Sequence, residues 1–153
     1  MRILSTGSAL PSRVVTNREL TGFLDTSDEW ISTRTGIGKR RVLTDESLDH
    51  LASRAAIGAL ENAGLLASEI DLILCSTVQG EWITPGLGCI VQRDLGATCP
   101  AVDINGACAG FVYALDIADA YLKAGKAARI LIVCAEAMSR LVDWTRREMC
   151  VLF

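Results

Sequence analysis

One stretch of the chain decides the class of fold that we expect: D-I-N-G-A-C-A-G-F, residues 103–111. The apolar run that leads into it, Ala101–Ile104, has the length of a buried β-strand, and the residues from Cys108 onward follow a helical period. A strand that turns through glycine into a helix is part of a βαβ unit, whose strands run parallel. The stretch therefore predicts an α/β fold with a mainly parallel, mixed sheet.

Cys108 lies at this junction between strand and helix, with only small residues beside it. Gly106 and Gly110 permit a tight turn and close backbone approach, and none of the other five cysteines has this pair of glycines around it. The free N–H groups and positive dipole at the start of a helix favour a thiolate. The pattern is typical of a nucleophile elbow and predicts that Cys108 attacks a thioester. Tight helix–sheet packing requires the same small residues. The pattern alone therefore leaves two interpretations open, Cys108 as a nucleophile and Cys108 as a small packing residue.

The rest of the chain repeats this alternation of short apolar runs and longer helical segments. Further strands are predicted at residues 3–5, 72–77, 129–135 and 150–153. Helices are predicted at 47–63, ended by Gly64, from Thr84 and Pro85 to about Gly96, and at 108–124, closed by Gly125. The third helix has alanines around much of its surface, so it can be packed on most sides. With no repeat, low-complexity segment or linker, residues 1–153 are expected to form one compact unit.

Composition excludes several classes of function. Half of the 153 residues are hydrophobic, which predicts a globular domain with a substantial core. The 18 acidic and 15 basic residues are interspersed, without a basic block that would favour nucleic-acid binding. No apolar run approaches the roughly 20 residues that span a bilayer, and residues 1–10 lack the features of an export signal. We therefore expect a soluble, cytoplasmic protein that binds neither nucleic acid nor membrane.

The six cysteines show no CxxC pair and no histidine at ligand spacing, which argues against a metal site and a redox motif. Cys75, Cys134 and Cys150 lie in apolar stretches, where inert buried thiols are expected. Free thiols of this kind fit a reducing compartment.

Three stretches closely resemble the β-ketoacyl-acyl carrier protein synthase III family. They are D-T-S-D-E-W-I-S-T-R-T-G-I at residues 25–37, G-A-C-A-G-F at 106–111 and the segment 143–153, and the likeness covers the chain in order. The resemblance implies a thiolase fold, of which this chain would form the N-terminal half, residues 1–153. In that fold two similar α/β halves make a five-layer αβαβα sandwich, in a chain about twice this length that is normally a homodimer.

The activity implied by the resemblance is acyl transfer that initiates fatty acid biosynthesis. An acyl-CoA primer, usually acetyl-CoA, first acylates Cys108. Malonyl-acyl carrier protein then loses CO₂ and attacks the acyl thioester. Coenzyme A enters as part of a substrate, so no separate cofactor is implied.

The resemblance also places the coenzyme A nucleotide on Trp30, Arg34 and Arg147. An indole and a guanidinium plane can both stack on adenine, and arginine pairs well with phosphate. Trp30 and Arg34 are four residues apart and would share a helix face. Without the resemblance, a surface cation–π pair is the simpler interpretation. Trp82 lies where the match is loose, so the primer's chain length is left open.

The family's catalytic His and Asn, which promote decarboxylation, have no match in these residues. The one histidine, His50, is expected on the solvated face of the 47–63 helix. Residues 150–153 read as the opening of a strand with no turn after it, so we expect a fragment that associates with its missing half or a second copy. Two alternatives to the full enzyme therefore remain: a catalytically incomplete interaction fragment, and a related ketosynthase of secondary metabolism.

Overall fold

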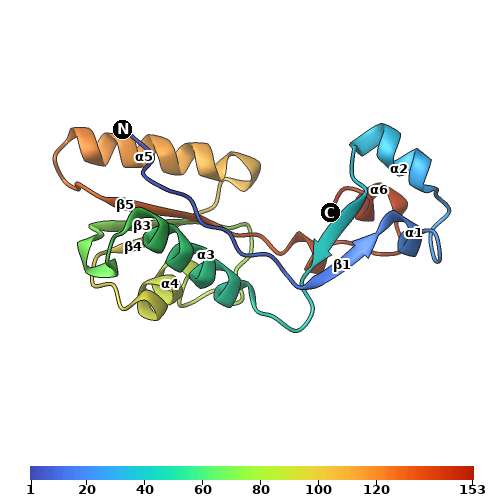
Figure 1. Cartoon of the computed structure of the whole chain (residues 1–153), viewed down its shortest axis with the longest axis horizontal. Helices are drawn as coiled ribbons and strands as arrows, with labels where there is room; N and C mark the ends of the chain where they lie inside the picture. Colours follow the sequence, from blue (N-terminus) through green and yellow to red (C-terminus); the bar gives the residue numbers. More distant parts are fainter. The chain divides into compact units, whose positions relative to one another are not determined.

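The computed structural model describes all residues, 1–153, and they divide into two compact units (Figure 1). The first unit comprises Met1–Ala9 and Ser47–Glu136, and the second comprises Leu10–Glu46 and Ala137–Phe153. The sequence pattern indicated one compact unit. The sequence shows no linker between the units because each unit is built from segments that are discontinuous in sequence. Each unit has its own hydrophobic cluster.

The first unit is built on a parallel sheet with strand order β4-β3-β5. These strands are β3 (Leu72–Ser76), β4 (Ala101–Ile104) and β5 (Ile130–Cys134). Ile73 pairs with Ala101 on one side of β3 and with Leu131 on the other, both in parallel register. The predicted α/β class and the three central strands are confirmed, with strand ends that differ by at most one residue.

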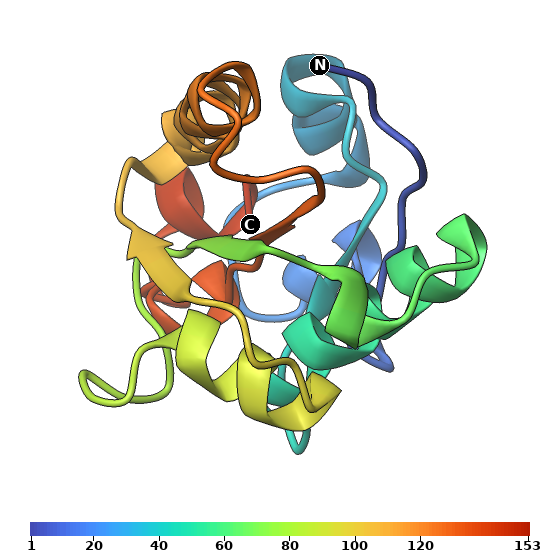
Figure 2. The same ribbon diagram turned by 90° about the vertical axis from the view of Figure 1, so that its left-hand side faces the viewer.

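Helices cover both faces of this sheet, as the two views in Figures 1 and 2 show. Helix α5 (Gly110–Lys123) packs on one face, while α3 (Leu48–Ala63) and α4 (Leu87–Leu95) pack on the other. Successive side chains of β3 point to opposite faces of the sheet. Ile73 and Cys75 belong to the cluster under α3 and α4. Leu72 and Leu74 pack with Ala114 under α5. A strand buried on both faces is continuously apolar for this reason.

The predicted 47–63 helix is confirmed as α3, with Ser47 as its N-cap and Gly64 in the left-handed conformation after it. The start predicted for the second helix was wrong, because α4 begins at Leu87 and Thr84 does not cap it. The Asp103 carboxylate instead accepts hydrogen bonds from the N–H groups of Leu87 and Gly88 at 2.7 and 2.6 Å. A cap supplied by another strand leaves no local signal in the sequence.

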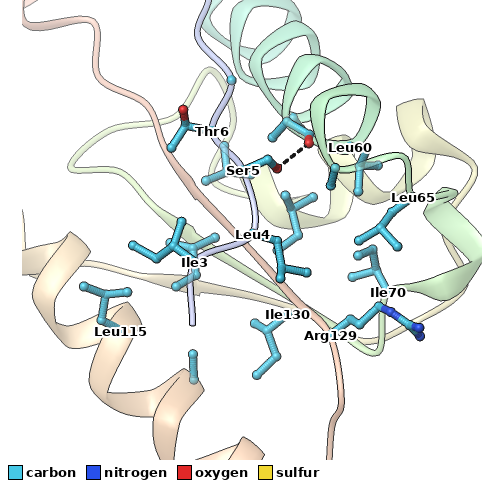
Figure 3. A pocket seen from close by; sticks show the side chains of 18 of the residues that line it. Ile3, Leu4, Ser5, Thr6, Leu60, Leu65, Ile70, Leu115, Arg129 and Ile130 are labelled. Atoms are coloured by element: carbon cyan, nitrogen blue, oxygen red, sulfur yellow. Dashed lines mark hydrogen bonds between the residues drawn. The ribbon is translucent and has the colours of Figure 1, made fainter. Parts of the chain in front are cut away.

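The N-terminal segment forms no strand, so the strand predicted at residues 3–5 was wrong. The segment lies along α3, where the Ser5 hydroxyl donates to the carbonyl of Ala59 and the Asn62 amide donates to the carbonyl of Thr6. The segment pairs with no strand. It lines a groove of about 370 Å³, whose other lining residues include Leu115 and Ile130 (Figure 3). Apolar residues alone cannot make a strand where no neighbouring backbone offers hydrogen bonds.

Helix α5 is packed on one face only, although its sequence would permit packing on most sides. Ala114 and Ala118 are buried against the sheet, but Phe111, Val112 and Tyr113 are exposed. The apolar composition of α5 therefore exceeds what this chain buries.

The second unit is small and contains elements that the sequence pattern did not reveal. Its β-strands are β1 (Arg13–Thr16) and β2 (Lys39–Val42), an antiparallel pair. Its helices are α1 (Asn17–Leu20), α2 (Asp28–Thr35), the 3₁₀ turn η3 (Met138–Arg140) and α6 (Arg147–Cys150). The core that joins them comprises Leu20, Leu24, Ile31, Val142, Cys150 and Val151.

The strand predicted at residues 150–153 was wrong. Cys150 ends α6, and the N–H of Val151 bonds back to the carbonyl of Arg147. Local i to i−4 hydrogen bonds satisfy this backbone where no strand lies beside it to form a ladder.

Candidate active site

Cys108 lies at the carboxyl-terminal edge of the parallel sheet. Strand β4 ends at Ile104, the 3₁₀ turn η2 (Ala107–Ala109) carries Cys108, and α5 begins at Gly110. Cys108 is exposed. Ligand and catalytic sites of open parallel sheets lie at this edge, because the connecting loops converge there.

The turn that presents Cys108 is strained and tightly packed. Ala107 has a φ of 45°, and it is the one residue other than glycine with positive φ. A Cβ at Gly106 would collide with the Tyr113 ring, and one at Gly110 would overlap the Ser76 hydroxyl. Strain retained in so crowded a turn is characteristic of a nucleophile elbow. Gly106 and Gly110 are tightly packed while Cys108 is exposed, so tight packing and an accessible thiol are compatible in this turn.

Near this turn, two side chains form hydrogen bonds with the backbone of Val78, beyond the ends of the strands. The Glu136 carboxylate, which follows β5, accepts a hydrogen bond from the N–H of Val78 at 2.9 Å. The Asn105 amide, three residues before Cys108, donates to the carbonyl of Val78 at 3.2 Å. Burial raises the pKa of Glu136, and the Val78 hydrogen bond partly offsets that rise. The sequence reasoning missed Glu136 and Asn105. A polar residue directly after a buried apolar strand was the available signal.

Trp30 is the centre of a second cluster, in the other unit. Helix α2 presents it, with the Ser27 hydroxyl accepting a hydrogen bond from the N–H of Trp30 as the N-cap. The guanidinium carbon of Arg34 lies 4.4 Å from the centroid of the Trp30 ring, so the predicted shared helix face is confirmed. A cation at this distance is attracted by the ring's quadrupole.

A third member of this cluster comes from α6. The guanidinium carbon of Arg147 lies 4.5 Å from the centroid of the Trp30 ring. Its Nη1 donates to the carbonyl of Asp25 at 2.8 Å, which fixes the arginine beside the loop that precedes α2. No such contact with the ring is made by the neighbouring Arg146, which is exposed. We call Trp30, Arg34 and Arg147 the stacking platform.

The other residues singled out from the sequence lie outside both clusters. His50 is exposed on α3, as predicted, and Trp82 is exposed in the loop before α4. Of the cysteines expected to be buried, Cys75 and Cys150 are, but Cys134, the last residue of β5, is exposed. No group of three or more His, Cys, Asp and Glu side chains is arranged to hold a metal ion. No helix has both the length and the apolar character needed to cross a membrane.

The chain is similar in sequence to known proteins over almost its whole length. The sequence profile of the family described as 3-oxoacyl-[acyl-carrier-protein (ACP)] synthase III matches residues 102–153. β-Ketoacyl-[acyl-carrier-protein] synthase III of Xanthomonas euvesicatoria pv. vesicatoria is 47% identical over 99% of this chain and 47% of its own length. The protein of that name from Aquifex aeolicus is 47% identical over 99% of the chain and 50% of its own length.

Solved structures give the same result. The crystal structure of 3-oxoacyl-[acyl-carrier-protein] synthase III from Aquifex aeolicus matches with a TM-score of 0.97 and 47% identity, over 99% of this chain and 50% of that one. The priming β-ketosynthase from the R1128 polyketide pathway matches with a TM-score of 0.95 and 38% identity, over 99% of this chain and 46% of that one. The fold is therefore that of the thiolase-like condensing enzymes.

Within this class, the chain is similar over almost its whole length to β-ketoacyl-[acyl-carrier-protein] synthase III. It spans about half the length of the curated relatives that it matches.

Proposed function

We propose that this chain supplies the acyl-accepting half of a β-ketoacyl-acyl carrier protein synthase III, with Cys108 as the nucleophile. The observation that carries the proposal is an exposed cysteine after a positive-φ residue, at the carboxyl edge of a parallel sheet. The Cys108 thiolate attacks the carbonyl carbon of an acyl-CoA. The bond from that carbon to the coenzyme A sulfur breaks, and coenzyme A leaves as a thiolate that takes up a proton.

The product of this step is an acyl thioester on Cys108, which is the primer for condensation. In the full reaction, malonyl-acyl carrier protein loses CO₂ and its carbanion equivalent attacks the Cys108 thioester, releasing a β-ketoacyl carrier protein and the free thiolate. This reaction would initiate fatty acid biosynthesis in the cytoplasm. Coenzyme A takes part as a substrate component, and the chain needs no other cofactor for the acyl transfer.

The stacking platform is the proposed site for the coenzyme A nucleotide. An aromatic ring flanked by two guanidinium groups offers flat surfaces for a purine and cations for phosphate. The exposed apolar face of α5 further supports association with another polypeptide, either the remaining half or a second copy in a homodimer. Light scattering at several concentrations, with and without the remaining half of a relative, measures this association.

The test of the nucleophile is acetyl transfer from acetyl-CoA to the protein, followed by mass spectrometry of peptides. We expect one acetyl group on the peptide that contains Cys108 and none in Cys108→Ala. Cys89→Ala and Cys134→Ala are matched controls, since both cysteines are exposed, and they should be acetylated like the wild type. Unchanged acetylation of Cys108→Ala would refute the proposal.

A second candidate function is priming in secondary metabolism, favoured by the likeness to the R1128 priming ketosynthase. It uses the same cysteine with another primer or acceptor, so a screen of acyl-CoA primers against carrier proteins separates the two. A catalytically incomplete fragment is the non-enzymatic alternative, since the one histidine is the exposed His50. Release of a β-ketoacyl product by this chain without a partner would exclude that alternative.

A further inference from the structure

A buried polar pair, Arg40 and Asn17, lies inside the second unit. Arg40 on β2 is 7% exposed, and Asn17 at the start of α1 is 1% exposed. Arg40 Nη1 donates to Asn17 Oδ1 at 2.9 Å. Arg40 forms no ion pair with a carboxylate, and its Nε has no hydrogen-bond partner. Burial of an arginine whose Nε has no partner costs free energy, because the N–H group loses water without gaining an acceptor.

Asn17 holds α2 at both ends. Its Nδ2 donates to Asp28 Oδ1 and to the carbonyl of Ile37, each at 2.7 Å, and approaches Ser32 Oγ at 3.3 Å. Asp28 is the first residue of α2, and Ile37 follows the glycine that ends it. The side chain of Asn17 thereby joins the first turn of the helix that carries Trp30 and Arg34 to the segment that follows it.

Arg40 connects this arrangement to α6. Its Nη2 donates to the carbonyl of Val151 at 3.3 Å, and Val151 is the C-cap of the helix that begins with Arg147. One continuous set of hydrogen bonds therefore runs from α2 through Asn17 and Arg40 to α6. These are the two helices whose side chains meet at the Trp30 ring.

We propose that Arg40 and Asn17 are positioning residues that set the spacing between Trp30 and Arg147 in the stacking platform. The part of this inference that concerns coenzyme A rests on the proposed function. The part that concerns platform geometry stands on the hydrogen bonds alone. No hydrogen bond or ring contact joins either residue to the platform, so both act through the placement of α2 and α6.

Two near-isosteric variants test the inference in the full 153-residue chain. Asn17→Asp keeps the shape but replaces both N–H donors with an oxygen that faces Asp28 and the Ile37 carbonyl. Arg40→Lys keeps the charge but cannot form two divergent hydrogen bonds from one planar group. Arg41→Lys is the matched control, because Arg41 is the next residue of β2 and is exposed. Leu43→Ala, at a buried position of the same unit outside the cluster that Trp30 packs against, is the control for a general loss of stability.

The first readout is the NMR signal of the Trp30 indole N–H, identified by its loss in Trp30→Phe. We expect this signal to shift in Asn17→Asp and Arg40→Lys, and to stay in place in Arg41→Lys and in Leu43→Ala at temperatures where all are folded. An unmoved Trp30 signal in both folded test variants would overturn the inference. So would an equal shift in Leu43→Ala, because the effect would then follow stability. If either test variant fails to fold, the other decides.

The second readout is the concentration dependence of Cys108 acylation by acetyl-CoA. We expect the half-saturating concentration to rise about tenfold in both test variants, which corresponds to about 1.4 kcal/mol of binding free energy, with little change in the rate at saturation. An unchanged half-saturating concentration would overturn the part of the inference that concerns coenzyme A. If the wild type shows no acylation at all while the Trp30 signal still shifts in the variants, the proposed function fails and the positioning role stands.

Discussion

The Asp103 carboxylate caps helix α4 through the N–H of Leu87, at 2.7 Å, from within the strand that leads to Cys108. Residues 101–104 therefore do more than lead to Cys108, because they also cap a helix on the opposite face of the sheet from α5. Gly86 and Gly88 have no room for a Cβ beside this carboxylate.

Removal of this cap should destabilise the first unit. We expect Asp103→Ala to lower the free energy of unfolding by about 1 to 3 kcal/mol, because two amide donors lose a charged acceptor. Urea denaturation followed by circular dichroism measures the change. Asp45→Ala, at an exposed loop position, is the control and should change stability by less than about 0.5 kcal/mol. Equal stability of the two variants would contradict this role for Asp103.

The turn around Cys108 should not tolerate a methyl group at Gly110. A Cβ there would overlap the hydroxyl of Ser76 in β3, so Gly110→Ala should cost about 1 to 3 kcal/mol and slow alkylation of Cys108 by displacing the turn. Gly38→Ala is the matched control, because a Cβ at Gly38 meets nothing within 4 Å. A Gly110→Ala protein with wild-type stability and Cys108 reactivity would show that the turn is looser than its packing indicates.

The six cysteines should separate into two groups on brief alkylation of the native protein. Cys89, Cys108 and Cys134 are exposed and should react, whereas Cys75, Cys99 and Cys150 are buried and should react only after denaturation. Burial raises the pKa of the Cys75 thiol, which further suppresses its thiolate. Peptide mass spectrometry after a short exposure to iodoacetamide gives the order. Early modification of Cys75 would be inconsistent with the two-sided burial of β3.

Glu136 should make stability depend on pH. Burial raises its pKa above the ordinary value of 4.5, so the folded protein holds this proton more tightly than the unfolded chain. The contribution is fully favourable below about pH 4.5 and is lost as pH rises through the folded value. Glu136→Gln keeps an acceptor for the Val78 N–H but cannot titrate. The stability of the wild type relative to this variant should therefore fall as pH rises from 4.5 upward, and a difference that rises instead would have the wrong sign.

The two adjacent arginines of the 143–153 segment should differ in function. Arg147 contacts the Trp30 ring and Arg146 does not, so Arg147→Lys should raise the half-saturating acetyl-CoA concentration for Cys108 acylation about tenfold. Arg146→Lys should leave it unchanged. Acylation kinetics with both variants measured side by side provide the comparison, and equal effects would remove Arg147 from the proposed coenzyme A site.

The sequence by itself determined the α/β class, the three central strands, the α3 helix and the placement of Cys108 between strand and helix. Each of these depends on a local pattern: a short apolar run, a 3.6-residue period, or glycines on both sides of a small turn. The same local spacing predicted that Trp30 and Arg34 share a helix face.

Tertiary structure decided everything that depends on groups distant in sequence. Several contacts join residues far apart in the chain: the Asp103 cap on α4, Arg147 with the Trp30 ring, Asn17 with Arg40, and Glu136 with Val78. The strands predicted at 3–5 and 150–153 were wrong for the same reason. A strand forms only where another backbone supplies its hydrogen bonds, and composition does not reveal that neighbour.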